Sequence, residues 1–276
     1  KVDDTPPETV KTISGPTCGP DDFWVTTGTA ITLTATDKEE PCAVGVWYIH
    51  YEIWWDSDND NVVDTKLVDE DINDDHVTFY FTEECLHEIR WYAVDNAGNQ
   101  ECMNTQQHRV DDTGPNQSII FGDPKIEDFY HHAHGNDYTI VGPNTPIYIT
   151  SDDTQDMNGT PKACTVGSNW LEYIVNWGDE WNNWQHSRGP YKVYDGDPED
   201  IDERPGIITV VEYMPESCWH EIHVWCEDKL GNQGVERWKD FIVDADEPVQ
   251  NWEYIGPELW MNNEHYISNV TIKRIN

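Results

Sequence analysis

One short acidic stretch has the residue types and the spacing of a calcium-binding loop. In DSDNDNVVD, residues 56–64, carboxylates stand at positions 1, 3, 5 and 9. In a tight turn these four groups can face one hard cation, and the seventh residue, Val62, can supply a backbone carbonyl. Carboxylates this close repel one another unless a cation is present. The stretch therefore predicts a calcium site formed by Asp56, Asp58, Asp60, Val62 and Asp64.

This stretch resembles the nine-residue DxDxDGxxD calcium loops, with two differences. The usual glycine is replaced by Asn61, and asparagine tolerates a positive φ better than most residues. The glutamate that completes a full EF-hand is also missing. The alternative interpretation is a solvated acidic turn in an aspartate-rich protein.

Histidine and tryptophan clusters give two weaker chemical signals. His131, His132 and His134 could bind a transition metal through their imidazoles, although such a cluster is more often a polar loop. A second set of side chains could stack on sugars if exposed, although tryptophan in a small sandwich is more often core. This set comprises Trp54, Trp55, Trp181 and Trp184.

No catalytic motif accompanies these clusters. The sequence contains no G-x-S-x-G elbow, no P-loop and no HExxH. Carboxylate pairs are so frequent that a glycosidase-like pair would arise by chance. We therefore expect a protein that is not an enzyme.

The composition indicates an acidic, sheet-rich protein. The 276 residues carry a net charge of −38, which repels nucleic acid and anionic membranes and attracts cations. The 14 Trp and 13 Tyr favour packed sheets over disorder. No apolar run approaches the roughly 20 residues that span a bilayer.

Repeated segments define the elements that must position these groups. An apolar strand ending in VDNAGN (94–99) and a join VDDTGP (110–115) recur as residues 222–232 and 243–248, and a third join opens the chain at 2–7. Between the joins, short alternating strands separated by turns are typical of a β-sandwich. No helical period persists. In the first unit we expect strands near 1–15, 31–37, 45–55, 77–81 and 88–94 and a last strand that leads to Val110, with an acidic loop after residue 55. In the second unit we expect them near 146–152, 170–177, 206–211 and 221–227.

The repeats predict an all-β fold of tandem immunoglobulin-like β-sandwiches. The predicted domains are 1–112, 113–247 with longer insertions, and a C-terminal segment 248–276 with one or two strands. This segment is either a partial third repeat or a strand donated to another subunit by β-augmentation, since lone strands leave backbone groups unpaired.

With these segments in view, the chain resembles the tandem immunoglobulin-like repeats of archaeal and bacterial surface proteins. Their VDDTPP linker, ITLTATD strand, YYRIW-like strand and YAVDNAGN strand correspond to residues 2–7, 31–37, 49–54 and 87–99. The second unit matches less well, because CEDKL (226–230) replaces the family's AVDNA. The resemblance implies stalks, adhesive surfaces or filament subunits.

The topology of such a sandwich predicts a second kind of calcium site. The loops after the second and sixth strands share one end of the sandwich with the incoming linker. This end would gather Asp111, Asp112, Asp152, Asp153 and Asp228 between the two units, and Asp3, Asp4, Asp37 and Asp95 upstream. A bridging calcium would stiffen the array, as in cadherin-like stalks; the alternative is that these residues only cap turns.

The cysteines and sequons favour an oxidising, extracellular setting. The repeat aligns Cys42 with Cys164 and Cys85 with Cys218, which suggests the bonds Cys42–Cys85 and Cys164–Cys218. The sandwich order, however, separates the members of each pair by a strand of roughly 25 Å, whereas a disulfide requires Cα atoms within about 7 Å. If that order holds, Cys85 meets Cys164, and Cys218 reaches Cys42 of another copy.

Three cysteines remain outside these pairings. Cys18 and Cys102 are further disulfide candidates, and Cys226 aligns with core residue Ala93, which predicts a buried thiol. Because seven is odd, at least one thiol is free or intermolecular. N-x-S/T sequons, which predict a glycoprotein, stand at Asn116, Asn158 and Asn269.

These observations predict a structural subunit of an extracellular filament or cell-surface layer or stalk. Its partners would be copies of itself, flanking repeats and glycans, and its cofactor Ca²⁺. The alternative is an adhesin or carbohydrate-binding module that uses exposed tryptophans. A third possibility is an accessory domain of a secreted hydrolase.

Overall fold

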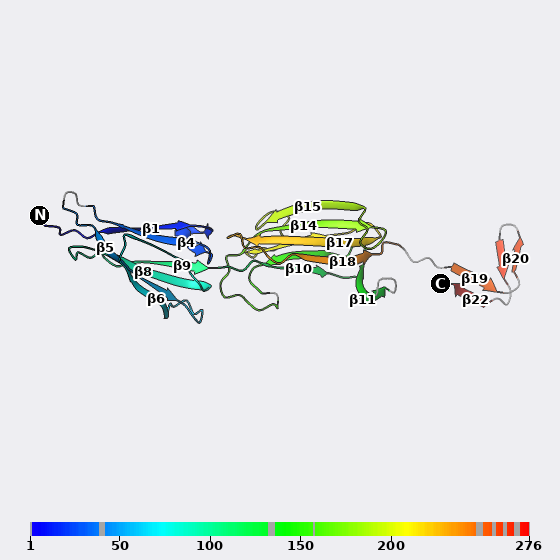
Figure 1. The fold of residues 1–276 in the computed structure, drawn as a ribbon. Helices are drawn as coiled ribbons and strands as arrows, with labels where there is room; N and C mark the ends of the chain where they lie inside the picture. Colours follow the sequence, from blue (N-terminus) through cyan, green and yellow to red (C-terminus); the bar gives the residue numbers. More distant parts are fainter. Residues whose placement is uncertain are drawn as a thin grey trace.

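The computed structural model describes residues 2–38, 42–131, 136–156 and 158–246, together with four strands between 251 and 275. Two groups of strands follow one another along the chain, and a third, smaller group lies beyond them (Figure 1). Among the described residues, no helix is both long and apolar enough to cross a membrane. The all-β prediction is confirmed.

The first group of strands, called here the first sandwich, pairs a three-stranded sheet with a six-stranded one. Their orders are β1-β4-β7 and β2-β3-β9-β8-β5-β6, and β3 and β9 run parallel. The elements are β1 (Glu8–Ser14), β2 (Thr17–Cys18), η1 (Pro20–Asp22), β3 (Trp24–Val25), β4 (Ala30–Thr36), β5 (Val46–Trp55), β6 (Thr65–Ile72), β7 (His76–Phe79), β8 (Cys85–Asp95) and β9 (Asn104–Val110).

Strand alternation builds the core of the first sandwich. Successive side chains of a strand point to opposite faces, so every second residue is buried. Ile31, Leu33 and Ala35 of β4 face Ile49 and Ile53 of β5 across the two sheets, and all five are buried. Each large side chain contributes about 1.5–3 kcal/mol by leaving water.

The second group of strands, called here the second sandwich, repeats this arrangement. Its sheets have the orders β10-β13-β16 and β11-β12-β18-β17-β14-β15, again with one parallel pair, β12 and β18. The strands are β10 (Asn116–Phe121), β11 (Lys125–His131), β12 (Asn136–Val141), β13 (Ile147–Asp152), β14 (Ser168–Gly178), β15 (His186–Tyr194), β16 (Ile207–Glu212), β17 (Trp219–Asp228) and β18 (Arg237–Val243).

Several strands lie outside the segments expected from the sequence, among them β6 and β15. The acidic segment after residue 55 was predicted as a loop, but its second half is β6, and β15 falls in the insertion of the second sandwich. Both are edge strands of the six-stranded sheets. Edge strands commonly carry exposed charges that discourage pairing with other chains, and this hides the alternation used to recognise strands.

The C-terminal strands number four, not the one or two expected. They are β19 (Asn251–Ile255), β20 (Glu258–Met261), β21 (Glu264–Ile267) and β22 (Thr271–Ile275). β19 pairs with β22, and β20 pairs with β21 inside that hairpin. The first four strands of each sandwich pair in the same nested way, β1 with β4 around β2 and β3, and β10 with β13 around β11 and β12.

Candidate functional site at the join between the sandwiches

Three aspartates converge where the linker from the first sandwich enters the second. Asp111 follows β9, Asp153 follows β13 and Asp228 ends β17, so three distant segments supply one carboxylate each. All three residues are fully buried, and one oxygen of each lies within 4.8 Å of the others. We call this set the join triad.

Backbone amides hold two members of the join triad in place. The Val166 N–H donates to Asp111 Oδ2 at 2.8 Å, and the Gly167 N–H donates to Asp153 Oδ2 at 2.8 Å. The Thr113 N–H donates to Asp111 Oδ1 at 3.2 Å, which forms an Asx turn in the linker. The loop before β14 therefore fixes both carboxylates.

A tight turn after β17 positions the third member. Asp228 Oδ1 accepts the backbone N–H groups of Leu230 and Asn232, each at 2.8 Å. The Asn232 side-chain amide donates to Asp228 Oδ2 at 2.7 Å and also to the Asp111 carbonyl oxygen at 2.9 Å. This turn thus fastens the linker to the second sandwich.

The charges of the join triad are only partly compensated. The Lys162 ammonium lies 2.7 Å from Asp153 Oδ1 and also donates to the carbonyl oxygens of Thr113 and Gly114. Burial, followed by the neighbouring Asp153 charge, raises the pKa of Asp111 to about 7. Burial also raises the pKa of Asp228. Because one ammonium faces three carboxylates, uncompensated negative charge remains that a divalent cation could balance.

Two of the five predicted ligands at this join point elsewhere. Asp112 accepts hydrogen bonds from the backbone N–H and the hydroxyl of Thr27, in the first sandwich. Asp152 accepts the N–H and the hydroxyl of Thr154 at 2.8 and 2.6 Å. The two neighbouring acidic residues of the linker therefore tie it to both sandwiches, Asp111 to the second and Asp112 to the first.

A disulfide bond crosses the same join. Cys85, at the start of β8, is bonded to Cys164, in the loop before β14, with their Cα atoms 5.1 Å apart. The bonds Cys42–Cys85 and Cys164–Cys218 suggested by the repeat alignment are therefore wrong. Their members occupy opposite ends of one sandwich, whereas Cys85 and Cys164 occupy facing ends of neighbouring ones.

The other cysteines carry free thiols. Cys226 lies buried on β17, as its alignment with Ala93 predicted, and the Gln117 side chain contacts its sulfur at 2.8 Å. Cys102 is exposed, and Cys18, Cys42 and Cys218 are half-buried.

A second triad stands at the opposite end of the first sandwich. Asp3, Asp37 and Asp95 also place one oxygen each within 4.8 Å, but only Asp95 is fully buried. Asn99 donates to Asp95 Oδ2 at 2.8 Å and to the Asp3 carbonyl at 3.2 Å, as Asn232 does at the join. Asp4, the fourth predicted ligand, is not part of this set.

The acidic loop after β5 brings three of its four carboxylates together. Asp56, Asp58 and Asp60 converge within the same 4.8 Å limit, whereas Asp64 accepts hydrogen bonds from Ser57 instead. The buried Asp56 accepts the backbone N–H groups of residues 60 and 61, so it also closes the turn. Asn61 has a φ of 69°, which its residue type tolerates. Val62 is exposed, with its N–H bonded to Asp60.

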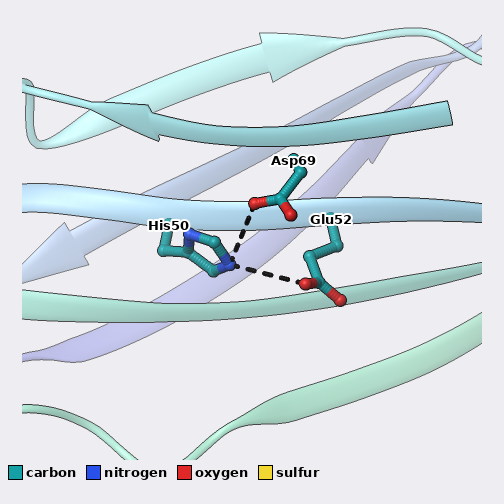
Figure 2. Close-up of side chains that lie close together, drawn as sticks. All are labelled: His50, Glu52 and Asp69. Atoms are coloured by element: carbon teal, nitrogen blue, oxygen red, sulfur yellow. Dashed lines mark ion pairs between the residues drawn. The ribbon is translucent and has the colours of Figure 1, made fainter. Parts of the chain in front are cut away.

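Figure 2 shows a further cluster, formed by one histidine and two carboxylates. His50 and Glu52 come from β5 and Asp69 from β6, and His50 Nε2 lies 3.9 Å from both carboxylates. The Lys66 ammonium approaches Glu52 to 2.6 Å and Asp69 to 2.8 Å. Although burial acts against it, bonds from Lys66 and Trp54 hold the pKa of Glu52 below its usual range. This cluster is a surface ion network.

The tryptophans proposed as a sugar-binding platform do not expose their rings fully. Trp54, Trp55, Trp181 and Trp184 are all half-buried. Lys66 and Arg90 lie 4.8 and 4.7 Å from the ring centre of Trp54, and the indole N–H of Trp181 donates to Asp240.

The structure describes only some of the remaining predicted sites. Asn158 is exposed in a turn, and Asn116 begins β10 with its amide bonded to the Asp156 carbonyl. Asn269, His132 and His134 lie outside the described residues, as does the side chain of His131 at the end of β11.

Sequence reasoning missed Lys162 and a repeated C-x-H pattern. Lys162 stands in an insertion without a counterpart in the first unit, so alignment of the repeats could not reveal it. The pattern Cys85-Leu86-His87 returns as Cys218-Trp219-His220, and this signal was available in the sequence.

No family model matches the chain, and no curated protein matches it. Similar solved structures include the fibronectin(III)-like modules of Clostridium thermocellum CbhA (13% identity, TM-score 0.31, 86% of this chain and 95% of that one). Others are the chicken CNTN1 FN1–FN3 domains (13%, 0.34, 96% and 83%) and a 1.5-MDa bacterial ice-binding adhesin (11%, 0.35, 91% and 69%). Identities and TM-scores this low carry no functional argument, and the fold assignment rests on the strand pairings and cores described above.

Proposed function

We propose that this chain is a structural module of an extracellular filament or cell-surface stalk, in which successive sandwiches are locked end to end. One observation carries the proposal: the Cys85–Cys164 disulfide crosses the join between the sandwiches. This covalent bond lies between the two cores and restricts rotation of one sandwich against the other. Restricted rotation is what a load-bearing or spacing element requires.

Calcium at the join triad would reinforce this lock. Ca²⁺ takes six to eight oxygen ligands, and Asp111, Asp153 and Asp228 offer up to six in a buried cluster. Because Asp111 belongs to the linker and the other two to the second sandwich, one ion would fasten the linker to the sandwich. We propose weaker sites at Asp3, Asp37 and Asp95 and at the loop of Asp56, Asp58 and Asp60.

Several features support an extracellular location. A disulfide between sandwiches persists in oxidising surroundings. The net charge of −38 suits a solvated surface that collects cations, and the exposed Asn158 could accept a glycan. The partners we propose are copies of the chain, flanking repeats and glycans.

We further propose that the C-terminal strands begin a third sandwich. Their nested pairing reproduces the first four strands of both sandwiches, which supports a partial repeat over a single donated strand. The join before them also repeats, because the Asp246 N–H donates to Asp244 Oδ1 at 3.1 Å, as Thr113 donates to Asp111.

Small-angle scattering of the monomer tests the lock. The expected result is one extended, rigid particle in calcium, a broader distance distribution in chelator, and further broadening in Cys85→Ser/Cys164→Ser. Cys102→Ser, which removes an exposed free thiol, is the control. Identical curves for wild type and the double variant, with and without calcium, would contradict a locking role.

A further inference from the structure

A disulfide between Cys85 and Cys164 joins the two sandwiches, and each of these cysteines has an equivalent in the other sandwich that forms no disulfide. Cys218 occupies the position of Cys85, and Cys42 occupies the position of Cys164. Both unused residues are half-buried free thiols. Cys42 follows the end of β4 and Cys218 precedes β17, and the end of β4 and the start of β17 lie at the two outer ends of the pair of sandwiches (Figure 1).

The surroundings of Cys218 reproduce those of Cys85. His87 Nδ1 lies 3.2 Å from the Cys85 carbonyl oxygen, and His220 Nδ1 lies 3.1 Å from that of Cys218. Both imidazoles are fully buried, and the Nε2 of each is 3.9 Å from a carboxylate four residues earlier in the chain. A tryptophan ring from the neighbouring strand stacks on each histidine, with centres 6.5 and 6.3 Å apart.

The surroundings of Cys42 likewise reproduce those of Cys164. The two loops read CAVG (42–45) and CTVG (164–167). The Val44 N–H donates to Asp3 Oδ2 at 3.1 Å, as Val166 donates to Asp111. The Gly45 N–H donates to Asp37 Oδ2 at 2.8 Å, as Gly167 donates to Asp153. Each cysteine is thus carried by a loop folded onto an aspartate triad.

Among the described residues, the corresponding ends of the two sandwiches differ in how their cysteine is covered. Cys85 is buried and bonded to Cys164, whereas Cys218 is half-buried and lines a hollow of about 420 Å³. Phe129, which is 41% exposed, contributes an uncovered apolar wall of this hollow, and Asp244 of the next join lies at its edge. A CxVG loop seated in this hollow would bring its cysteine to Cys218.

We propose that Cys218 of one copy forms a disulfide with Cys42 of a second copy, so that chains join head to tail. The contact is heterologous, so each added copy presents a fresh pair of ends and growth is open-ended. The inference rests on the proposed structural function and names the partner.

The bond requires an oxidant. Two thiols lose two protons and two electrons as the S–S bond forms, and a small disulfide such as oxidised glutathione takes them up and becomes two thiols. The first exchange gives a mixed disulfide on one cysteine, and the thiolate of the other cysteine then displaces glutathione from it.

Complementary single-cysteine variants test this assignment. All proteins carry Cys18→Ser and Cys102→Ser, which remove the other accessible thiols, and are incubated in a glutathione redox buffer with calcium and salt to screen the net charge. On non-reducing gels, the parent should give a ladder, Cys42→Ser alone and Cys218→Ser alone should remain monomers, and their equimolar mixture should stop at dimers. Peptide mapping should find Cys42 linked to Cys218.

Three outcomes would overturn the inference. They are a parent that stays monomeric or only glutathionylated, a ladder that survives either single variant, and a mapped bond between other residues. The scattering test above uses monomers and the Cys85–Cys164 bond only, so it can succeed when this test fails. The two failures are therefore distinguishable.

Discussion

The two aspartate triads use equivalent residues but form different chemical environments. The triad of Asp3, Asp37 and Asp95 has two half-buried members, whereas every member of the join triad is fully buried. A sandwich precedes the join triad, and the Lys162 ammonium lies 2.7 Å from the Asp153 carboxylate. One repeated pattern therefore gives a partly exposed set of carboxylates in one place and a fully buried set in the other. The presence of a preceding sandwich therefore distinguishes the environment of the join triad from that of its upstream counterpart.

The largest expected effect comes from removing the disulfide that only the join has. Cys85 and Cys164 are 79 residues apart. Closing a loop of that length lowers the entropy of the unfolded chain, which stabilises the folded state by about 4.5 kcal/mol in the chain-entropy treatment. We expect Cys85→Ser/Cys164→Ser to lower the free energy of unfolding by several kcal/mol in urea titrations. Cys102→Ser is the control and should change it little. Equal stability of wild type and the double variant would contradict the coupling.

A pH dependence separates the join triad from its upstream counterpart. The pKa of Asp111 is raised to about 7 in the folded protein, above its unfolded value of 3.8. Between these two pH values the folded state therefore binds more protons than the unfolded state. Without calcium, the stability that Asp111 contributes to the protein is lost as the pH rises from about 4 to 7, by at most about 4 kcal/mol. Asp228, whose pKa is also raised, acts in the same direction.

Urea unfolding at pH 5 and pH 8 measures this loss. The decline should be smaller in Asp111→Asn, and calcium should suppress it in the wild type, because the cation replaces the proton. A wild type and variant with equal pH slopes would show that burial does not perturb Asp111.

Calcium affinity offers a matched comparison between neighbouring residues. Asp153→Asn removes a carboxylate of the join triad, whereas Asp152→Asn alters one that only caps Thr154. Calorimetry at pH 8 should show one binding event lost in Asp153→Asn and none lost in Asp152→Asn. At a hundredfold excess over the dissociation constant, calcium would stabilise the wild type by about 2.7 kcal/mol. Equal calcium binding by both variants would show that the join triad does not bind calcium.

The exposed loop after β5 should give the smallest effect. Asp58→Ala should remove a weaker binding event with little change in stability, because Asp56 continues to accept the backbone N–H groups that close the turn. Calorimetry that finds the same calcium stoichiometry in this variant would show that the loop is only an acidic turn.

The sequence predicted most of the core and much of the join, for identifiable reasons. Alternation at Ile31, Leu33 and Ala35 required a half-buried strand, and the sandwich order alone placed Cys85 opposite Cys164. The same order brought the loops of Asp153 and Asp228 to the linker. Three features could not be predicted: β6 and β15, whose charged edges mask alternation; Lys162, which lies in an unrepeated insertion; and the complete burial of the triad, which depends on the packing of both sandwiches.

Single-molecule stretching tests the locked join most directly. If the Cys85–Cys164 bond carries the load past the join, the segment between these residues cannot extend when both sandwiches unfold. Adding a reductant should then release roughly 280 Å of further length, from 79 residues at about 3.6 Å each. Calcium should raise the force at which the second sandwich unfolds. Full extension of all residues before reduction, at a force indifferent to calcium, would contradict the account.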